Sequence, residues 1–323
     1  MERLMRQQTL IHPASPQHLL ELFVEDCRDR QLTAETIRRY RSSLNQYLAY
    51  LDQRGISMVN IDKHVLHDYI RHRYSQGVDQ RTLENDLSGI AGLYEYLVFE
   101  DYMERNPVPG VRKRYLRRYK KENDGDVESP RKLLTVEEMS LLINSVIDTR
   151  DRAILTLLAK TGMRRGELIA TDIDDMDWTT QSITIKRNQF KKRSGRTVFF
   201  DDETTRLLKR WLILREKLNP ETHALFIGEH GLRLNRNGIY SMVAKYAQRV
   251  GVHNPKSSKP EDHVSPHCFR HWFTTHLRRA GMDREFIKAL RGDRRREAID
   301  IYDRIDREEL RRAYLAFIPQ LGL

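Results

Sequence analysis

Two apolar stripes with the spacing of an α-helix run through the first hundred residues of this 323-residue chain. Both advance by three or four residues at each step, and their members are Ile37, Tyr40, Leu44, Leu48 and Leu51, then Leu83, Leu87, Ile90, Tyr94 and Leu97. Such steps keep the apolar side chains on one face of a helix, which must be buried against a partner. The N-terminal part of the chain is therefore predicted to be a helical bundle.

Local start and stop signals divide this part into four helices. Ser15 before Pro16 is a typical N-cap, and Thr33 can cap the helix that carries the first stripe. A shorter helix is predicted over about 62–74, and the helix with the second stripe ends before Asn106-Pro107. We predict an N-terminal tail over residues 1–14 and a first domain over residues 15–106.

A basic segment follows, and we predict residues 107–132 to be an interdomain linker. Its first half carries the clusters Arg112-Lys113-Arg114 and Arg117-Arg118, and its second half is polar and contains glycine. Such a composition is typical of a solvated connection. A capping box from Thr135 to Glu138 then begins the second domain, residues 133–323.

The second domain is predicted to be mainly helical with a small β-sheet. An apolar helix over 153–159 ends at Gly162, as expected for a glycine that follows a helix. Residues 182–185 and 197–200 alternate between apolar and polar side chains, which predicts a hairpin. Helices continue on both sides of it.

Two polar boxes and one tyrosine carry the candidate chemistry of this domain. The first box runs from Thr161 to Leu168 and contains Arg164; about a hundred residues later, His267 and Arg270 share one helix face. An arginine can hold two phosphate oxygens, and a histidine can move a proton. Ser265-Pro266 places His267 in the first turn of its helix, where N–H groups favour an anion. Tyr302, 32 residues after Arg270, is a candidate attacking group.

The order and spacing of these elements resemble the tyrosine recombinases, the integrase family that cuts and rejoins DNA. The frames T-G-x-R-x-x-E-L, H-x-x-R and I-Y match in that order. The helices before them are similar to the family's SAM-like core-binding domain, including Thr36 and Tyr40 in a T-x-x-x-Y opening. The resemblance extends from about residue 15 to the end, with the layout of compact Xer-type and archaeal integrases. It implies a helical core-binding domain followed by a mixed α/β catalytic domain.

The resemblance implies a catalytic set, which consists of Arg164, Lys191, His267, Arg270 and Tyr302. Lys191 lies five residues before Arg196, as in the family's K-x-x-x-x-R frame, and its neighbour Lys192 stays open as an alternative. Asp293 stands where the family usually has His or Trp. We expect it to hold Arg270 or Tyr302, unless Arg291 or Arg294 takes over the phosphate contact.

The implied function is site-specific recombination of DNA through a 3′-phosphotyrosyl intermediate, without metal, ATP or any other cofactor. The implied partners are double-stranded DNA with inverted-repeat half-sites and further copies of the chain, in dimers and tetramers. The apolar stripe after Tyr302 (Leu310, Ala313, Tyr314 and Phe317) is expected to dock on a neighbouring protomer, with packing on its own domain as the alternative. The basic residues expected to contact DNA are Arg38, Arg39, Arg41, Arg81, Arg112, Lys113, Arg114, Arg117 and Arg118.

Composition agrees with a polyanionic partner, because 57 lysines and arginines against 46 acidic residues give a net charge of +11. Only Cys27 and Cys268 occur, so no disulfide framework is indicated. Neither an apolar run of membrane-spanning length nor a signal core is seen, and we expect a cytoplasmic protein without membrane contact.

Three other interpretations were weighed. A metal site at His267, His271, His276 and Cys268 is disfavoured, because neither H-E-x-x-H nor C-x-x-C accompanies them. A type IB topoisomerase shares the chemistry but relaxes supercoils as a monomer. A non-catalytic DNA-binding regulator would keep the fold without the reaction, and only Asp293 favours it.

Overall fold

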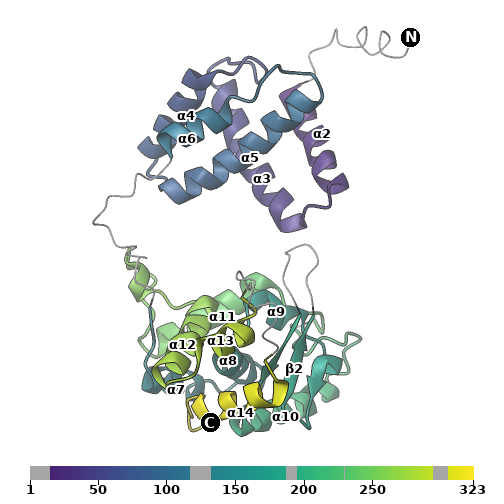
Figure 1. Cartoon of the computed structure of the whole chain (residues 1–323), viewed down its shortest axis with the longest axis vertical. Helices are drawn as coiled ribbons and strands as arrows, with labels where there is room; N and C mark the ends of the chain where they lie inside the picture. Colours follow the sequence, from purple (N-terminus) through teal and green to yellow (C-terminus); the bar gives the residue numbers. More distant parts are fainter. Residues whose placement is uncertain (1–14, 117–131, 187–194, 229, 294–304) are drawn as a thin grey trace. The chain divides into compact units, whose positions relative to one another are not determined.

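The structure is a computed structural model that describes residues 15–116, 132–186, 195–228, 230–293 and 305–323. The chain divides into two compact units, Met1–Asp124 and Gly125–Leu323 (Figure 1). The described residues are mostly helical, with one small sheet in the second unit. The predicted fold class is confirmed. None of the described helices combines the length and apolarity needed to cross a membrane.

The first unit contains the four predicted helices, α2 (Pro16–Asp29), α3 (Ala34–Asp52), α4 (Lys63–Ser75) and α5 (Gln80–Phe99). Both predicted caps form: the Ser15 hydroxyl accepts from the His18 N–H at 3.2 Å, and Thr33 accepts from Thr36 at 3.2 Å. The stripe on α5 is fully buried, and α3 packs along it. The helical-bundle prediction is therefore confirmed.

The start of the predicted linker is a fifth helix, α6 (Val108–Tyr115), so the linker prediction is wrong for this part. Val108 and Val111 are buried and, with Leu116, belong to the core of the first unit. The buried residues stand among basic ones that face away from the core. Because basic residues prevail in the composition of this segment, composition alone predicted a solvated connection. The helical bundle therefore extends beyond residue 106.

The second unit is built around α8 (Thr149–Thr161), whose residues from Ala153 to Thr161 are all buried. Its other helices are α7 (Val136–Asn144), α9 (Arg165–Ala170), α10 (Asp202–Lys217), α11 (Arg236–Arg249), α12 (Pro266–Arg279), α13 (Arg284–Arg291) and α14 (Arg307–Phe317). Helices α10 and α12 pack directly against α8. The predicted capping box forms before α7, where Thr135 accepts from the Glu138 N–H at 3.1 Å and Glu138 accepts from the Thr135 N–H at 2.9 Å.

The sheet has three antiparallel strands in the order β1 (Met176–Asp177), β2 (Ser182–Ile185) and β3 (Arg196–Phe199). The predicted hairpin is confirmed, and Ile185 pairs with Arg196 at the end where the chain connects the two strands. This register puts the Arg196 side chain beside α13, against which β3 packs.

The C-terminal tail packs its apolar stripe on its own domain, which is the alternative given above, and docking on a neighbouring protomer stays a prediction. Tyr314 is fully buried, and its hydroxyl donates to the Lys160 carbonyl oxygen at 3.0 Å. The Lys160 ammonium, also fully buried, donates to Asp201 at 2.6 Å, to Glu203 at 2.5 Å and to the Pro319 carbonyl at 2.7 Å. The tail therefore completes a buried charge cluster at the C-terminal end of α8.

We expect Lys160→Met to destabilise the second unit by roughly 3–5 kcal/mol, because it leaves the carboxylates of Asp201 and Glu203 buried without their cation. All three tryptophans of the chain lie in this unit, so tryptophan fluorescence during urea denaturation reports its unfolding.

Arg312→Met is the matched control. Arg312 pairs with Glu308 in the same unit, and the two side chains are 78% and 52% exposed. Exposed ion pairs contribute little net stability. Equal losses in the two variants would contradict the role given to burial.

Candidate active site

The first polar box begins with a turn that only glycine fits. Gly162 ends α8 with a left-handed φ of 59°, and a Cβ there would lie 2.3 Å from the ring of Phe273 on α12. The same residue offers its carbonyl oxygen to the Nη1 of Arg270 at 2.7 Å. The turn therefore allows α8 and α12 to pack closely. It also places Arg164, two residues after Gly162, near Arg270 of the second box.

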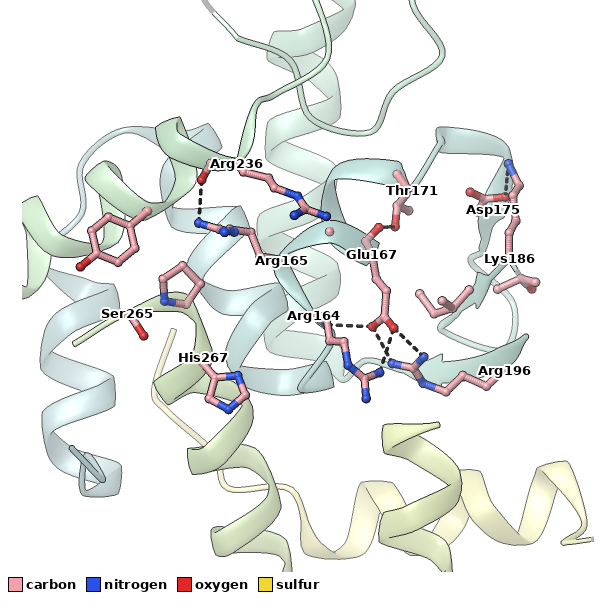
Figure 2. Close-up of a pocket in the computed structure, with 16 residues that line it drawn as sticks. Arg164, Arg165, Glu167, Thr171, Asp175, Lys186, Arg196, Arg236, Ser265 and His267 are labelled. Carbon is pink, nitrogen blue, oxygen red and sulfur yellow. Dashed lines mark hydrogen bonds and ion pairs between the residues drawn. The ribbon is translucent and has the colours of Figure 1, made fainter. Parts of the chain in front are cut away.

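Glu167 fixes Arg164 in place. Its carboxylate accepts from the Arg164 N–H at 2.8 Å and from Arg164 Nη1 at 3.0 Å, and it also binds both terminal nitrogens of Arg196, at 3.1 and 2.8 Å (Figure 2). Burial raises the pKa of Glu167, but the hydrogen bond and charge of Arg196, followed by Arg164, outweigh it and lower the pKa to about 2. Glu167 is thus an anion that orients two arginines from different elements.

Arg270 is the most buried cation of the site, with only 5% of its side chain exposed. Besides the bond to Gly162, its Nη2 donates to the Arg291 carbonyl oxygen at 2.7 Å. Desolvation, helped by the nearby charges of Arg164, Arg291 and Arg196, lowers the pKa of Arg270 to about 9. A further anion at this place would therefore be strongly favoured.

Three arginines meet at the C-terminal end of α13. Arg196 Nε donates to the Leu290 carbonyl at 2.7 Å, and Arg164 Nη1 donates to the Arg291 carbonyl at 3.2 Å, alongside Arg270. The last carbonyls of a helix lack intrahelical partners and carry its negative dipole end, so guanidinium groups are stabilised there.

Asp293 completes the cluster. One of its oxygens, Oδ1, lies 3.4 Å from Arg270 Nη2 and 3.7 Å from Arg164 Nη2; the other lies 3.0 Å from Arg291 Nε. Of the alternatives given for Asp293, contact with Arg270 is the one that the described residues show.

His267 is the second residue of α12, as predicted, and lines a cavity of about 650 Å³ (Figure 2). Against two acidic residues, five of the 16 residues that line this cavity are arginine or lysine: Arg164, Arg165, Lys186, Arg196 and Arg236. Such a lining suits a polyanion. Arg164 and His267 come from boxes about a hundred residues apart, and the structure brings both to one cavity.

The remaining predicted residues fall into two groups. Lys191, Lys192, Tyr302, Arg117 and Arg118 lie outside the described residues. In the first unit, Arg38, Arg39, Arg81, Lys113 and Arg114 are exposed and Arg112 is half-buried. Arg41 differs, because both of its terminal nitrogens bind Glu21 at 2.7 Å.

Sequence reasoning missed Glu167 and the structural use of Arg196. The signal for Glu167 was its spacing from Arg164, which is that of a capping box. No local signal existed for Arg196, because its partners lie 29 and 94 residues away in the chain.

The comparison with known families agrees with this geometry. Residues 132–309 match the phage integrase family, and residues 20–101 match the N-terminal SAM-like domain of phage integrases. The chain belongs to the phage integrase family. This membership confirms the predicted resemblance and the enzyme class, a tyrosine-type site-specific DNA recombinase.

Relatives align over nearly their whole length. Tyrosine recombinase XerC of Pseudomonas aeruginosa is 29% identical over 305 residues, which cover 91% of this chain and 92% of the relative. Tyrosine recombinase XerD of Staphylococcus epidermidis is 25% identical over 299 residues, with 90% and 95% covered. These relatives favour recombination over the topoisomerase interpretation.

Solved structures share the fold. The XerH site-specific recombinase in a post-cleavage complex with a palindromic difH substrate has a TM-score of 0.66 at 20% identity, covering 94% of this chain and 82% of that one. A lambda integrase dimer bound to a COC′ core site has a TM-score of 0.63 at 13% identity, with 90% and 98% covered.

The low pKa of Glu167 makes a prediction about pH. A carboxylate whose pKa is lowered from 4.5 to about 2 adds about 3 kcal/mol to the stability of the folded state, since one pKa unit corresponds to about 1.4 kcal/mol. This contribution is complete above pH 4.5 and disappears as the pH falls toward 2. The stability difference between wild type and Glu167→Gln should therefore be largest near pH 7 and shrink below pH 4.5. A difference that stays constant in urea melts from pH 7 to pH 3.5 would contradict it.

Gly292 offers a second prediction. It has a φ of +61°, and a Cβ there would lie 2.7 Å from Cδ of Arg196, which Glu167 and Leu290 hold in place. Gly251→Ala is the control, because Gly251 has a φ of +79° with nothing within 4 Å. We expect the control to lose about 1–2 kcal/mol from backbone strain alone. Gly292→Ala should lose roughly 1–3 kcal/mol more through steric displacement. Tryptophan fluorescence in urea measures both, and equal losses would refute the packing argument.

Proposed function

We propose that this recombinase cleaves double-stranded DNA by attack of Tyr302 on a scissile phosphate held by Arg164 and Arg270. One observation carries the proposal most: the Nη2 atoms of these two arginines lie near one and the same anionic atom, Asp293 Oδ1, at 3.7 and 3.4 Å. A phosphate oxygen has the same charge and hydrogen-bonding needs as that carboxylate oxygen.

The two arginines would offset the charge that builds on the phosphate in the transition state. Their orientation is fixed in advance by Glu167, Gly162 and the end of α13, so little reorganisation is needed when the phosphate arrives. Arg270 is nearly excluded from water, which strengthens its interaction with an anion.

Proton transfer would be divided between two groups. A tyrosine hydroxyl has an ordinary pKa near 10 and needs a proton acceptor or an orienting partner when it attacks. We assign this role to His267, which lines the cavity beside Arg164. Lys191, with Lys192 as the alternative, would protonate the departing 5′ oxygen.

The product would be a 3′-phosphotyrosyl enzyme and a free 5′-hydroxyl. Because the covalent link preserves the energy of the broken phosphodiester, a 5′-hydroxyl from another strand can reverse the step without ATP or metal. This reversibility is what recombination between two duplexes requires.

DNA binding would use both domains. The exposed arginines and lysines on α3, α5 and α6 suit phosphate contacts, with Arg41 the weakest candidate because Glu21 already neutralises it. We propose recognition of inverted-repeat half-sites, with the catalytic domain within residues 133–323 and the core-binding domain from residue 15 through α6. Dimers and tetramers would assemble on the DNA, because exchange between two duplexes needs four active sites.

The test is covalent trapping. A nicked suicide half-site, from which the cleaved end diffuses away, should give an SDS-resistant protein–DNA adduct with wild-type protein in EDTA. Tyr302→Phe should form no adduct but bind the half-site with unchanged affinity in a gel-shift assay.

Tyr240→Phe tests a second candidate nucleophile, because Tyr240 lines the cavity. An adduct that survives in Tyr302→Phe and disappears in Tyr240→Phe would move the assignment. Failure of wild-type protein to form any adduct on a site it binds would favour a non-catalytic regulator. Adduct formation with relaxation of supercoils by the monomer, but without strand exchange, would favour a topoisomerase.

A further inference from the structure

Asp293 occupies the position where a phosphate would bind. Its Oδ1 is the atom that Nη2 of Arg164 and Nη2 of Arg270 share, at 3.7 and 3.4 Å. A carboxylate in this position would repel the scissile phosphate if both stayed there, so its presence needs a physical reason.

The hydrogen bonds of the two arginines leave this direction for an anion. Arg164 Nη1 already donates to Glu167 and to the Arg291 carbonyl, and Arg270 Nη1 donates to the Gly162 carbonyl. Arg270 Nη2 donates one hydrogen to the Arg291 carbonyl, and its other hydrogen faces Asp293. Among the described residues, Asp293 is therefore the anion that meets both outward-facing nitrogens.

The charges of the described cluster also require an anion at the position of Asp293. Four guanidinium groups, those of Arg164, Arg196, Arg270 and Arg291, surround two carboxylates. Glu167 is already bound to Arg164 and Arg196, which leaves Asp293 as the neighbouring anion of the buried Arg270 and of Arg291. Without a counter-charge, a guanidinium with 5% exposure is strongly disfavoured.

The backbone at Asp293 is fixed, whereas its side chain can be displaced. The Asp293 N–H donates to the Lys288 carbonyl at 3.1 Å and the Gly292 N–H donates to the Ala289 carbonyl at 3.1 Å, which anchors the end of α13. The Asp293 side chain is 30% exposed and lies at ion-pair distances above 3.3 Å from Arg164 and Arg270. Rotation of the short Asp293 side chain is enough to open this position to an incoming anion.

We propose that Asp293 is a placeholder for the scissile phosphate: its carboxylate positions Arg164 and Arg270 in the protein without DNA and turns away when the phosphate takes its place. This inference rests on the proposed function for the identity of the displacing anion. Asp293 is a positioning residue, since it acts through the two arginines. The need to displace it disfavours stray anions and leaves the site to a phosphate that a bound duplex delivers.

The experiment uses the full chain without DNA and inorganic phosphate as the probe. Asp293→Asn keeps the size of the side chain and removes its negative charge. Phosphate should then bind about tenfold more tightly, because a neighbouring like charge disfavours an anion by about one logarithmic unit or more. Asp293→Glu retains the carboxylate and should bind phosphate like wild type. Isothermal titration calorimetry at constant ionic strength measures the dissociation constants.

Two controls localise the effect. Asp174→Asn changes the net charge equally at a carboxylate that is 75% exposed and pairs with His223, and it should leave phosphate binding unchanged. Adding Arg164→Lys to Asp293→Asn should remove the gain, because lysine has a single nitrogen and cannot bind Glu167 and the phosphate through two separate ones, as Nη1 and Nη2 of Arg164 can. A gain that persists in this double variant, or appears in Asp174→Asn, would reveal an adventitious ion only.

Equal phosphate affinity in wild type and Asp293→Asn would overturn the proposal. If Asp293→Asn unfolds in phosphate-free buffer, added phosphate should restore the tryptophan fluorescence of the folded state, and failure to restore it would also overturn the proposal.

The suicide half-site separates this inference from the proposed function. A tenfold gain in phosphate binding without any wild-type adduct would keep the placeholder and reject the cleavage reaction. A normal wild-type adduct with no gain in phosphate binding would keep the reaction and reject the placeholder.

Discussion

The buried guanidinium of Arg270 is the interaction on which the rest of the site depends. It joins the Gly162 turn after α8 to the C-terminal end of α13, through bonds of 2.7 Å to each carbonyl. A side chain at Gly162 would disturb this arrangement, because its Cβ would lie 2.3 Å from the ring of Phe273 on α12. One arginine therefore joins both polar boxes and α13, the helix that precedes the proposed nucleophile Tyr302 in the sequence.

Bringing several arginines together costs electrostatic free energy, which the fold offsets in three ways. Peptide carbonyls at the end of α13 accept hydrogen bonds from Arg164, Arg196 and Arg270; Glu167 binds two of these arginines; and Asp293 approaches the third. Burial, followed by the charges of the neighbouring arginines, lowers the pKa of Arg270, so the compensation for this cation is incomplete. The excess of guanidinium groups over carboxylates lowers the stability of the folded protein. The same excess attracts a phosphate to the site.

Much of the fold was predictable because its signals are local. Ser15, Thr33 and the Thr135–Glu138 box start helices through hydrogen bonds that span three residues, and the stripe on α5 is buried as its spacing predicted. Helix α6 was missed because its few apolar residues stand among basic ones. The tail was assigned to a partner because sequence cannot distinguish an apolar face that packs on its own domain from one that packs on another copy.

The sequence by itself determined the chemistry available to this protein: the arginines, the histidine and their order and spacing, which carried the family resemblance and the fold class. Tertiary structure decided how the described groups are used. Glu167 joins Arg164 to Arg196, three arginines bind the end of α13, and Asp293 stands at the shared position. The bonds of Arg196 to the Leu290 carbonyl and of Arg164 to the Arg291 carbonyl cross 94 and 127 residues of chain, and that of Arg270 to the Gly162 carbonyl crosses 108. No local pattern encodes such distances, because they arise only when α8, α12, α13 and β3 pack together.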